Sequence, residues 1–187
     1  MMTPVFAVGE KAEMAVYQAP AGSYSFSYPS SWMLVDRESF EAIQTLADQH
    51  SAEAGRIMTE ELKPKIEELG MAFLVSSDWL RHISIDCQEA MGMTADNLSG
   101  IQNIVVTLML ANGYETLQGP EILDMDDGRQ VLVVTYSYEK AGTEGVGVQA
   151  YMATADTLYT FTLTSSQEKV EKDLVVLAVM LSSSELK

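Results

Sequence analysis

Apolar side chains near the N-terminus follow a two-residue spacing, which is the period of a half-buried β-strand. The rings of Tyr24, Phe26 and Tyr28 alternate with serines. Pro29 has no N–H to donate, so it ends this strand, and the following turn returns Trp32 to the sheet. Because the rings share one face, we expect them to form part of a core. The alternative is an exposed aromatic strip that stacks on a ligand.

The next segment, about residues 36–69, changes to the three- and four-residue spacing of a helix. Asp36 is suited to cap its N-terminus, with Glu38 in the first turn, and Gly70 is suited to end it. Pro64 must break or kink the helix. The face expected to be apolar and buried consists of Phe40, Ile43, Leu46, Ala47, Ala54, Ile57, Met58, Leu62, Ile66 and Leu69.

Two strands and a second helix are predicted in the middle of the chain. The strands cover residues 71–77 and 82–87. Thr94 is expected to cap the helix and Gly113 to end it. The apolar stripe of this helix is predicted to contain Leu98, Ile101, Val105 and Leu108, with Met109 beside them.

The last third of the chain predicts hairpins and a closing helix. Asp127-Gly128 is a hairpin turn signal between strands at 114–125 and 129–139. A second hairpin joins residues 146–153 to 157–163. The faces expected to be apolar are Leu132, Val134, Tyr136 and Tyr138, then Tyr159, Phe161 and Leu163.

The closing helix begins after Ser165, Ser166, Gln167 and Glu168, which match a capping box. Its stripe is predicted to be Val170, Leu174, Leu177 and Leu181. Since hairpins produce antiparallel pairing, the fold class is α+β and not a doubly wound parallel sheet.

Charge narrows the choice of partners. The chain has 187 residues, with 11 Lys and Arg against 27 Asp and Glu, and a net charge of −16. The excess is spread over both halves, so it repels phosphate backbones and argues against nucleic acid as a partner. A solvated acidic surface explains it most simply; recruitment of cations or of a basic partner is the alternative. No apolar run approaches the ~18 residues of a membrane span.

The N-terminal residues 1–14 are expected to be a tail. Val5 and Ala7 stand in an arrangement that resembles the end of a secretory signal, without the charged and apolar regions that precede one. This segment is either the remnant of a signal peptide or a plain N-terminal tail, and the sequence leaves both interpretations open. Residues 15–187 are then one domain, since this length suits a single core.

Residues 82–89 hold the one cluster of His, Asp, Cys and Glu. On a strand His82 and Asp86 share a face, whereas Cys87 points with Ile83 and Ile85 to the other. Cys87 is therefore expected to be a buried core residue and not a nucleophile activated by His82. His82 and Asp86 are ~13 Å apart at strand rise, too far to bind one metal together.

The acidic turn at Asp124, Asp126 and Asp127 is the other candidate for chemistry. A calcium loop needs glycine at its sixth position and an acidic residue at its twelfth. From Asp124 the glycine comes fifth and the twelfth residue is Thr135, so a plain hairpin turn is predicted. The twelve methionines, Met91 and Met93 among them, are expected to fill the core. No catalytic, cofactor-binding or metal-binding residue is assigned.

Two segments resemble the PsbP-like domains. The run Tyr-Ser-Phe-Ser-Tyr-Pro at 24–29 followed by Trp32 is similar to their opening, and residues 151–185 are similar to their closing strand, turn and helix. The family includes bacterial secreted lipoproteins of unknown function. The resemblance implies a mainly antiparallel sheet with helices on both sides, an α/β/α sandwich, and usually no catalysis. The helical stretch at about 36–69 and His82, where the family usually has Asn, depart from the pattern.

The resemblance implies a non-catalytic, extracellular or surface-anchored domain that binds a protein or small molecule not specified by the sequence. We expect no cofactor; the oligomeric state stays open. One alternative is a hydrolase that uses His82 with acidic groups from other strands. Another is a carrier of a small ligand or metal ion. A cytoplasmic location is the alternative to the extracellular one.

Overall fold

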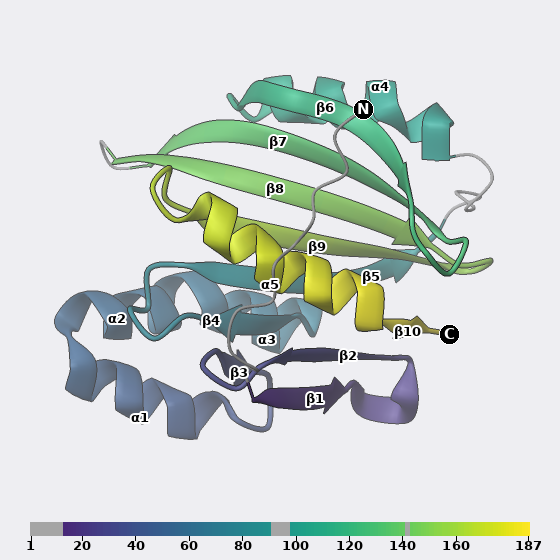
Figure 1. Ribbon diagram of the computed structural model, residues 1–187. Coiled ribbons are helices and arrows are strands. Elements are labelled where there is room, and N and C mark those ends of the chain that lie inside the picture. The colour runs from purple at the N-terminus through teal and green to yellow at the C-terminus, as the bar shows by residue number, and fades with distance from the viewer. Residues whose placement is uncertain (1–12, 91–97, 141–142) are drawn as a thin grey trace.

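The computed structural model describes residues 13–90, 98–140 and 143–187. Within them the chain forms two antiparallel sheets and five α-helices (Figure 1). The larger sheet has seven strands in the order β3-β4-β5-β9-β8-β7-β6. In chain order these are β3 (Met33–Val35), β4 (Ala72–Val75), β5 (His82–Glu89), β6 (Glu115–Asp124), β7 (Gln130–Lys140), β8 (Thr143–Ala153) and β9 (Thr157–Ser165). The predicted antiparallel α+β class is confirmed.

The smaller sheet has the order β1-β2-β10 and comprises β1 (Met14–Gln18), β2 (Tyr24–Pro29) and β10 (Glu185–Leu186). A short 3-10 turn, η1 (Pro20–Gly22), joins β1 to β2. Strand β1 was not predicted, since residues 1–14 were expected to be a tail and Val16 of this strand is largely exposed. Pairing of β10 with β2 brings the two ends of the described chain together.

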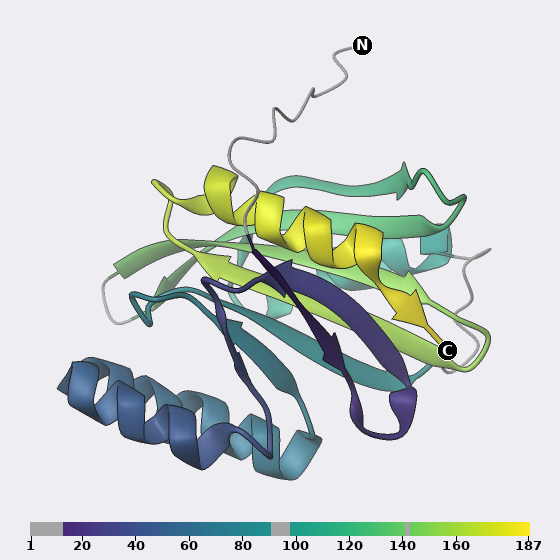
Figure 2. The ribbon, with the colours of Figure 1, turned by 60° about the horizontal axis from the view of Figure 1, so that its bottom comes forward.

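One face of the larger sheet is covered by the smaller sheet and by α5 (Val170–Ser183), as Figure 2 shows. The opposite face is covered at one end by α1 (Phe40–His50), α2 (Ala52–Arg56), the π-helical η2 (Ile57–Leu62) and α3 (Lys63–Leu69). At its other end α4 (Leu98–Ala111) packs on β6 and β7. The expected helices on both sides of the sheet are therefore present. None of the described helices is long and apolar enough to cross a membrane.

The largest core lies between the large sheet and the layer of α5 and β2. Tyr24, Phe26 and Trp32 are buried in it and Tyr28 packs at its edge, as the alternation predicted. Trp32 shares this cluster with α5, because Val176, Leu177, Met180 and Leu181 belong to it. The aromatic residues of β2 are thus core and not an exposed strip. The faces predicted for the two hairpins are also confirmed, since Tyr159, Phe161 and Leu163 join this core while Leu132, Val134 and Tyr136 pack under α4.

The helical stretch before β4 is less continuous than predicted. Ser51 adopts an extended conformation between α1 and α2, and its hydroxyl accepts from the N–H of Ala54. The π-helical η2 runs directly into α3, and Pro64 lies in the first turn of α3. Gly70 ends α3 in the left-handed region, as expected. Leu46 and Leu69, expected on the buried face, are exposed.

Three further helix predictions need correction. In α4 the buried position is Met109, whereas Leu108 is exposed. In α5 Leu174 is 37% exposed, and the neighbouring Asp173 is buried in its place. The predicted capping box is wrong because Ser165 is the last residue of β9 and the helix begins at Val170. The predicted cap Thr94 and the pair Met91 and Met93 lie outside the described residues.

Candidate functional site

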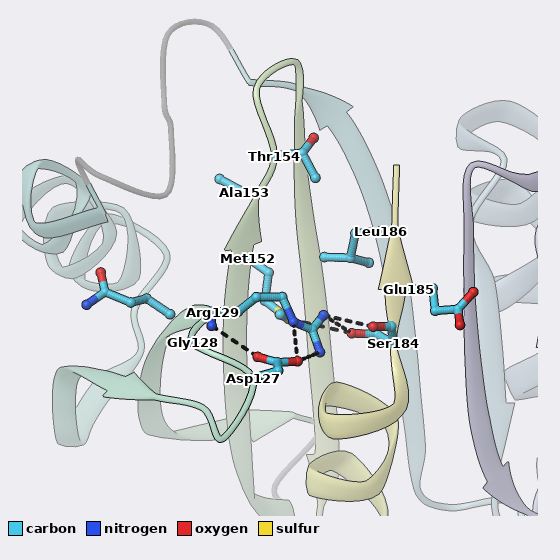
Figure 3. Close-up of a pocket in the computed structure, with 10 residues that line it drawn as sticks. Asp127, Gly128, Arg129, Met152, Ala153, Thr154, Ser184, Glu185 and Leu186 are labelled. Carbon is cyan, nitrogen blue, oxygen red and sulfur yellow. Dashed lines mark hydrogen bonds and ion pairs between the residues drawn. The ribbon is translucent and has the colours of Figure 1, made fainter.

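A cavity of about 740 Å³ opens at the C-terminal end of α5 (Figure 3). Its walls come from three places that are distant in sequence: the β6–β7 turn, the β8–β9 turn and β10. The lining residues are Asp127, Gly128, Arg129, Gln130, Met152, Ala153, Thr154, Ser184, Glu185 and Leu186. The volume is in the range of small-molecule sites.

Arg129 determines the shape of this cavity. Its Nη1 donates to the carbonyl oxygen of Ser184 at 2.8 Å and to its Oγ at 2.9 Å, and Nη2 donates to the carbonyl oxygen of Leu181 at 3.3 Å. The Leu181 carbonyl also accepts from the N–H and from the Oγ of Ser184, the residue that caps the C-terminus of α5. The positive charge of the guanidinium also interacts favourably with the negative, C-terminal end of the helix dipole. Arg129 therefore ties the β6–β7 turn to the end of α5.

Asp127 completes this arrangement from the same turn. Its Oδ2 accepts from Nε of Arg129 at 2.7 Å, and its Oδ1 accepts from the backbone N–H of Arg129 at 3.0 Å. These hydrogen bonds lower the pKa of Asp127, so the carboxylate stays charged and compensates the guanidinium. Gly128 has φ 84, which suits the left-handed turn position. The acidic segment is thus a hairpin turn, as predicted.

The cavity can hold a ligand through its main chain and its small side chains. Arg129 and Asp127 are engaged with each other and with α5, so the ion pair contributes little free charge to a ligand. The N–H of Lys187 donates to the carbonyl oxygen of Ser23 in β2. Successive residues of an antiparallel strand direct their backbone N–H and C=O groups to opposite sides, so those of Leu186 point away from β2. Thr154 and the apolar Met152 and Ala153 form the opposite wall.

Cys87 is exposed, which contradicts the predicted burial. The strand register is right, because Ile83 and Ile85 are buried in the main core on the same face. The last three residues of β5, Cys87 among them, are all exposed. Cys87 lines a second cavity, of about 320 Å³, together with Tyr17 and Tyr24.

The thiol is open to solvent, yet its neighbours disfavour the thiolate. Burial by the surrounding atoms and then the nearby Asp86 carboxylate raise the pKa of Cys87 to about 12. A reagent can reach Cys87, but little thiolate is present to react.

His82 and Asp86 are not brought together with Cys87. Both lie on the face of β5 opposite to Ile83, and the His82 ring contacts Phe73 with 5.9 Å between ring centroids. Asp86 accepts a hydrogen bond from Gln88. In the described part of the chain, His, Cys, Asp and Glu form no group of three that could hold a metal ion.

The sequence did not reveal an ionic cluster around Arg81. The guanidinium of Arg81 pairs with Asp173 of α5 and, at 3.0 Å, with Asp78, and it lies 5.6 Å from the ring centroid of Trp32. Asp173 is 1% exposed and also accepts from Ser165 Oγ at 2.7 Å. The one feature of the sequence that could have indicated this cluster was Asp173, an acidic residue on the side of α5 that faces the core. This cluster joins the β4–β5 loop to the start of α5.

Burial opposes ionisation of Asp78, but hydrogen bonds from Ser76 and Arg81 outweigh it and lower its pKa to about 2. Lys169 adds a weaker ion pair at 3.7 Å from the same carboxylate. With all of its charges paired, this cluster is a structural one and leaves no group free to act on a substrate.

No protein-family description and no curated protein matches this chain. Solved structures do. The solution structure of cyanobacterial PsbP (CyanoP) from Synechocystis sp. PCC 6803 is similar over 99% of this chain and 100% of its own, with a TM-score of 0.56 and 15% identity. A crystal structure from Bacteroides thetaiotaomicron VPI-5482 is similar over 92% of this chain and 48% of its own, with a TM-score of 0.51 and 11% identity. At these identities the likeness concerns the fold, and this chain has the PsbP-like fold.

Proposed function

We propose that the protein is a non-catalytic binding domain that takes a small ligand in the cavity at the end of α5. The cavity of about 740 Å³ carries this proposal. It is bounded by two turns and β10, and the Arg129 hydrogen bonds connect the β6–β7 turn to the end of α5. Such pre-formed cavities, with a few polar groups among apolar ones, are the usual form of ligand sites.

Two observations favour binding over catalysis. The PsbP-like resemblance implies domains that usually do not catalyse. Cys87 and His82 also lie on opposite faces of β5, so this strand does not assemble a thiol nucleophile with its base. We further propose an extracellular or cell-surface location, which is supported by the signal-like residues Val5 and Ala7. Fractionation of native cells that recovers the protein in the cytosol would contradict that location.

A ligand screen tests the proposed site. Wild-type protein is screened by thermal shift against a library of small polar metabolites, and each hit is measured by calorimetry. Thr154→Phe, which adds a ring at the cavity wall, should abolish binding, whereas Ala42→Phe on the exposed side of α1 should not. A hit that binds Thr154→Phe as well as wild type places the ligand elsewhere. A hit that wild type converts into a product overturns the non-catalytic proposal.

A further inference from the structure

The second cavity, of about 320 Å³, is built by four segments that are distant in sequence. Tyr17 and Tyr24 come from β1 and β2, and Cys87 comes from β5. The other walls are residues 36–38, between β3 and α1, and the C-terminal part of α3 with Gly70. We call it the tyrosine cavity. It shares no lining residue with the cavity at the end of α5, and its volume is at the lower end of the range of small-molecule sites.

The two tyrosine rings of this cavity are fixed by their packing. Tyr17 and Tyr24 are each 6% exposed, and their rings meet edge to face with 5.8 Å between centroids. The Tyr24 ring also stacks on Phe26 and meets Tyr159 edge to face. A hydrogen bond joins the side chains of Tyr17 and Tyr24. Because each phenol oxygen has two lone pairs, this pair retains acceptor capacity for a ligand that donates hydrogen bonds.

The charged groups that line the tyrosine cavity are two carboxylates and one guanidinium. Arg37 donates from Nη2 to the carbonyl oxygen of Glu67 at 2.6 Å, so its charge is directed to α3. Asp36 accepts on Oδ1 from the backbone N–H groups of Glu38 and Ser39 at 3.1 and 2.9 Å. From the described residues its Oδ2 accepts no hydrogen bond. Asp36 therefore has one carboxylate oxygen for a ligand, and Glu38 adds a second negative charge.

Asp36 lies close enough to both phenols to affect their ionisation. Burial is the largest cause that raises the pKa of Tyr17 and of Tyr24, and Asp36 and Cys87 also raise both. Because Asp36 and Cys87 line the tyrosine cavity, we place the phenol oxygens on the cavity side of the rings. Ile66, which is 1% exposed, contributes an apolar wall from α3. The cavity thus combines oxygen acceptors and negative charge with an apolar surface.

We propose that the tyrosine cavity binds a small organic amine, with its ammonium group toward Asp36 and the tyrosine hydroxyls and its apolar part against α3. An ammonium group has three N–H donors and no acceptor, which matches carboxylate and phenol oxygens. An anion would be repelled by Asp36 and Glu38 and by the net charge of −16. A bare metal ion is disfavoured, because His, Cys, Asp and Glu form no group of three for it among the described residues.

The test uses benzylamine and its neutral counterpart, benzyl alcohol. Calorimetry measures the binding of each to wild type, and benzylamine should bind at least about tenfold more tightly, a difference of ~1.4 kcal/mol. Cys87 reports where the ligand lies, because it is the one cysteine of the chain and lines the tyrosine cavity. Benzylamine should therefore slow the labelling of Cys87 by a thiol reagent, with half of the effect at the dissociation constant found by calorimetry.

Charge is tested with Asp36→Asn and Glu38→Gln together. Asparagine keeps the Oδ1 acceptor that Asp36 offers to the start of α1, so the fold should persist while benzylamine binds at least about tenfold more weakly. The matched control, Asp126→Asn with Glu171→Gln, removes two exposed charges elsewhere and should bind like wild type. If thermal unfolding shows the double variant to be destabilised, Glu38→Gln alone should still weaken binding.

Four results would overturn the proposal. Wild type that does not bind millimolar benzylamine has no amine site. Benzyl alcohol that binds as tightly as benzylamine shows that the positive charge is not recognised. Binding that leaves the labelling rate of Cys87 unchanged places the amine outside the tyrosine cavity. An equal loss of affinity in the control charge variant shows that the amine responds only to the net charge of the protein.

Discussion

Arg81 reaches across 92 residues of sequence to pair with Asp173, which is almost entirely buried in α5. The carboxylate accepts from Arg81 on one oxygen and from Ser165 on the other. A charge placed inside a core is tolerated when it is paired and hydrogen-bonded in this way. The pair therefore determines how α5 sits on the sheet at its N-terminal end.

Breaking this pair should be costly, and replacing both partners should not. Asp173→Ala leaves the partly buried guanidinium with Asp78 as its one carboxylate partner and removes the acceptor of Ser165 Oγ, so we expect a loss of ~3 kcal/mol in the free energy of unfolding, the low end for a broken buried pair. The double variant Arg81→Met with Asp173→Leu should recover most of that loss, because an apolar pair needs no desolvation. Urea unfolding monitored by circular dichroism measures both. A double variant no more stable than Asp173→Ala would contradict this account.

Asp78 predicts a dependence of stability on pH. Its pKa in the folded protein is about 2, below its ordinary value of ~3.9. A depressed pKa contributes stability that is present above ~pH 4 and is lost as the pH falls toward 2. Unfolding free energies measured between pH 5 and pH 2 should therefore fall more steeply in wild type than in Asp78→Asn. If the unfolding free energies of wild type and Asp78→Asn fell in parallel with pH, Asp78 would not contribute to the pH dependence of stability.

Truncation of Trp32 should be among the most damaging changes in the chain. Trp32→Ala removes a buried ring from the core and the cation–π contact with Arg81, so we expect a loss of ~3–5 kcal/mol. Trp79 is also buried, hence the emission of Trp32 is measured in a Trp79→Phe background. A blue-shifted maximum is expected; a solvent-like one would place Trp32 on the surface.

Arg129→Met should loosen the end of α5. It removes the donors to the carbonyl oxygens of Leu181 and Ser184, and charged hydrogen bonds of this kind contribute ~1.5–3 kcal/mol. Hydrogen exchange should speed up over residues 181–186, while the exposed Lys172→Met leaves it unchanged. Unaltered exchange in Arg129→Met would mean that α5 ends without help from the β6–β7 turn.

Cys87 should react with thiol reagents in the native protein, but slowly. The sulfur is accessible, while its raised pKa of about 12 keeps the thiolate scarce near neutral pH. The labelling rate should therefore still rise between pH 8 and pH 10, whereas an unperturbed thiol would begin to level off near ~8.5. Cys87→Ala should change stability by no more than ~0.5 kcal/mol, as surface substitutions do. A rate that levels off near pH 8.5 would contradict the raised pKa.

Local patterns alone determined which face of most strands is buried. Tyr24 and Phe26, and likewise Tyr159 and Phe161, could be assigned to a core because side chains alternate across any strand regardless of its neighbours. Gly70 and the Asp127-Gly128 turn were predictable for the same reason, since a left-handed residue or a tight turn depends on a few adjacent residues. The antiparallel α+β class followed from the hairpins.

Tertiary structure decided what depends on distant partners. Helix periodicity could not say whether Leu108 or Met109 of α4 faces inward, because that rotation depends on where β6 and β7 lie. Asp173 is stable in the core because it pairs with Arg81 from the β4–β5 loop. Cys87 is exposed because it lines a cavity between β5 and the residues Tyr17 and Tyr24 of the smaller sheet, which strand alternation could not predict. The cavity at the end of α5 could not be predicted from the sequence either, since its walls are two turns and one strand that are distant in sequence and come together only in the folded protein.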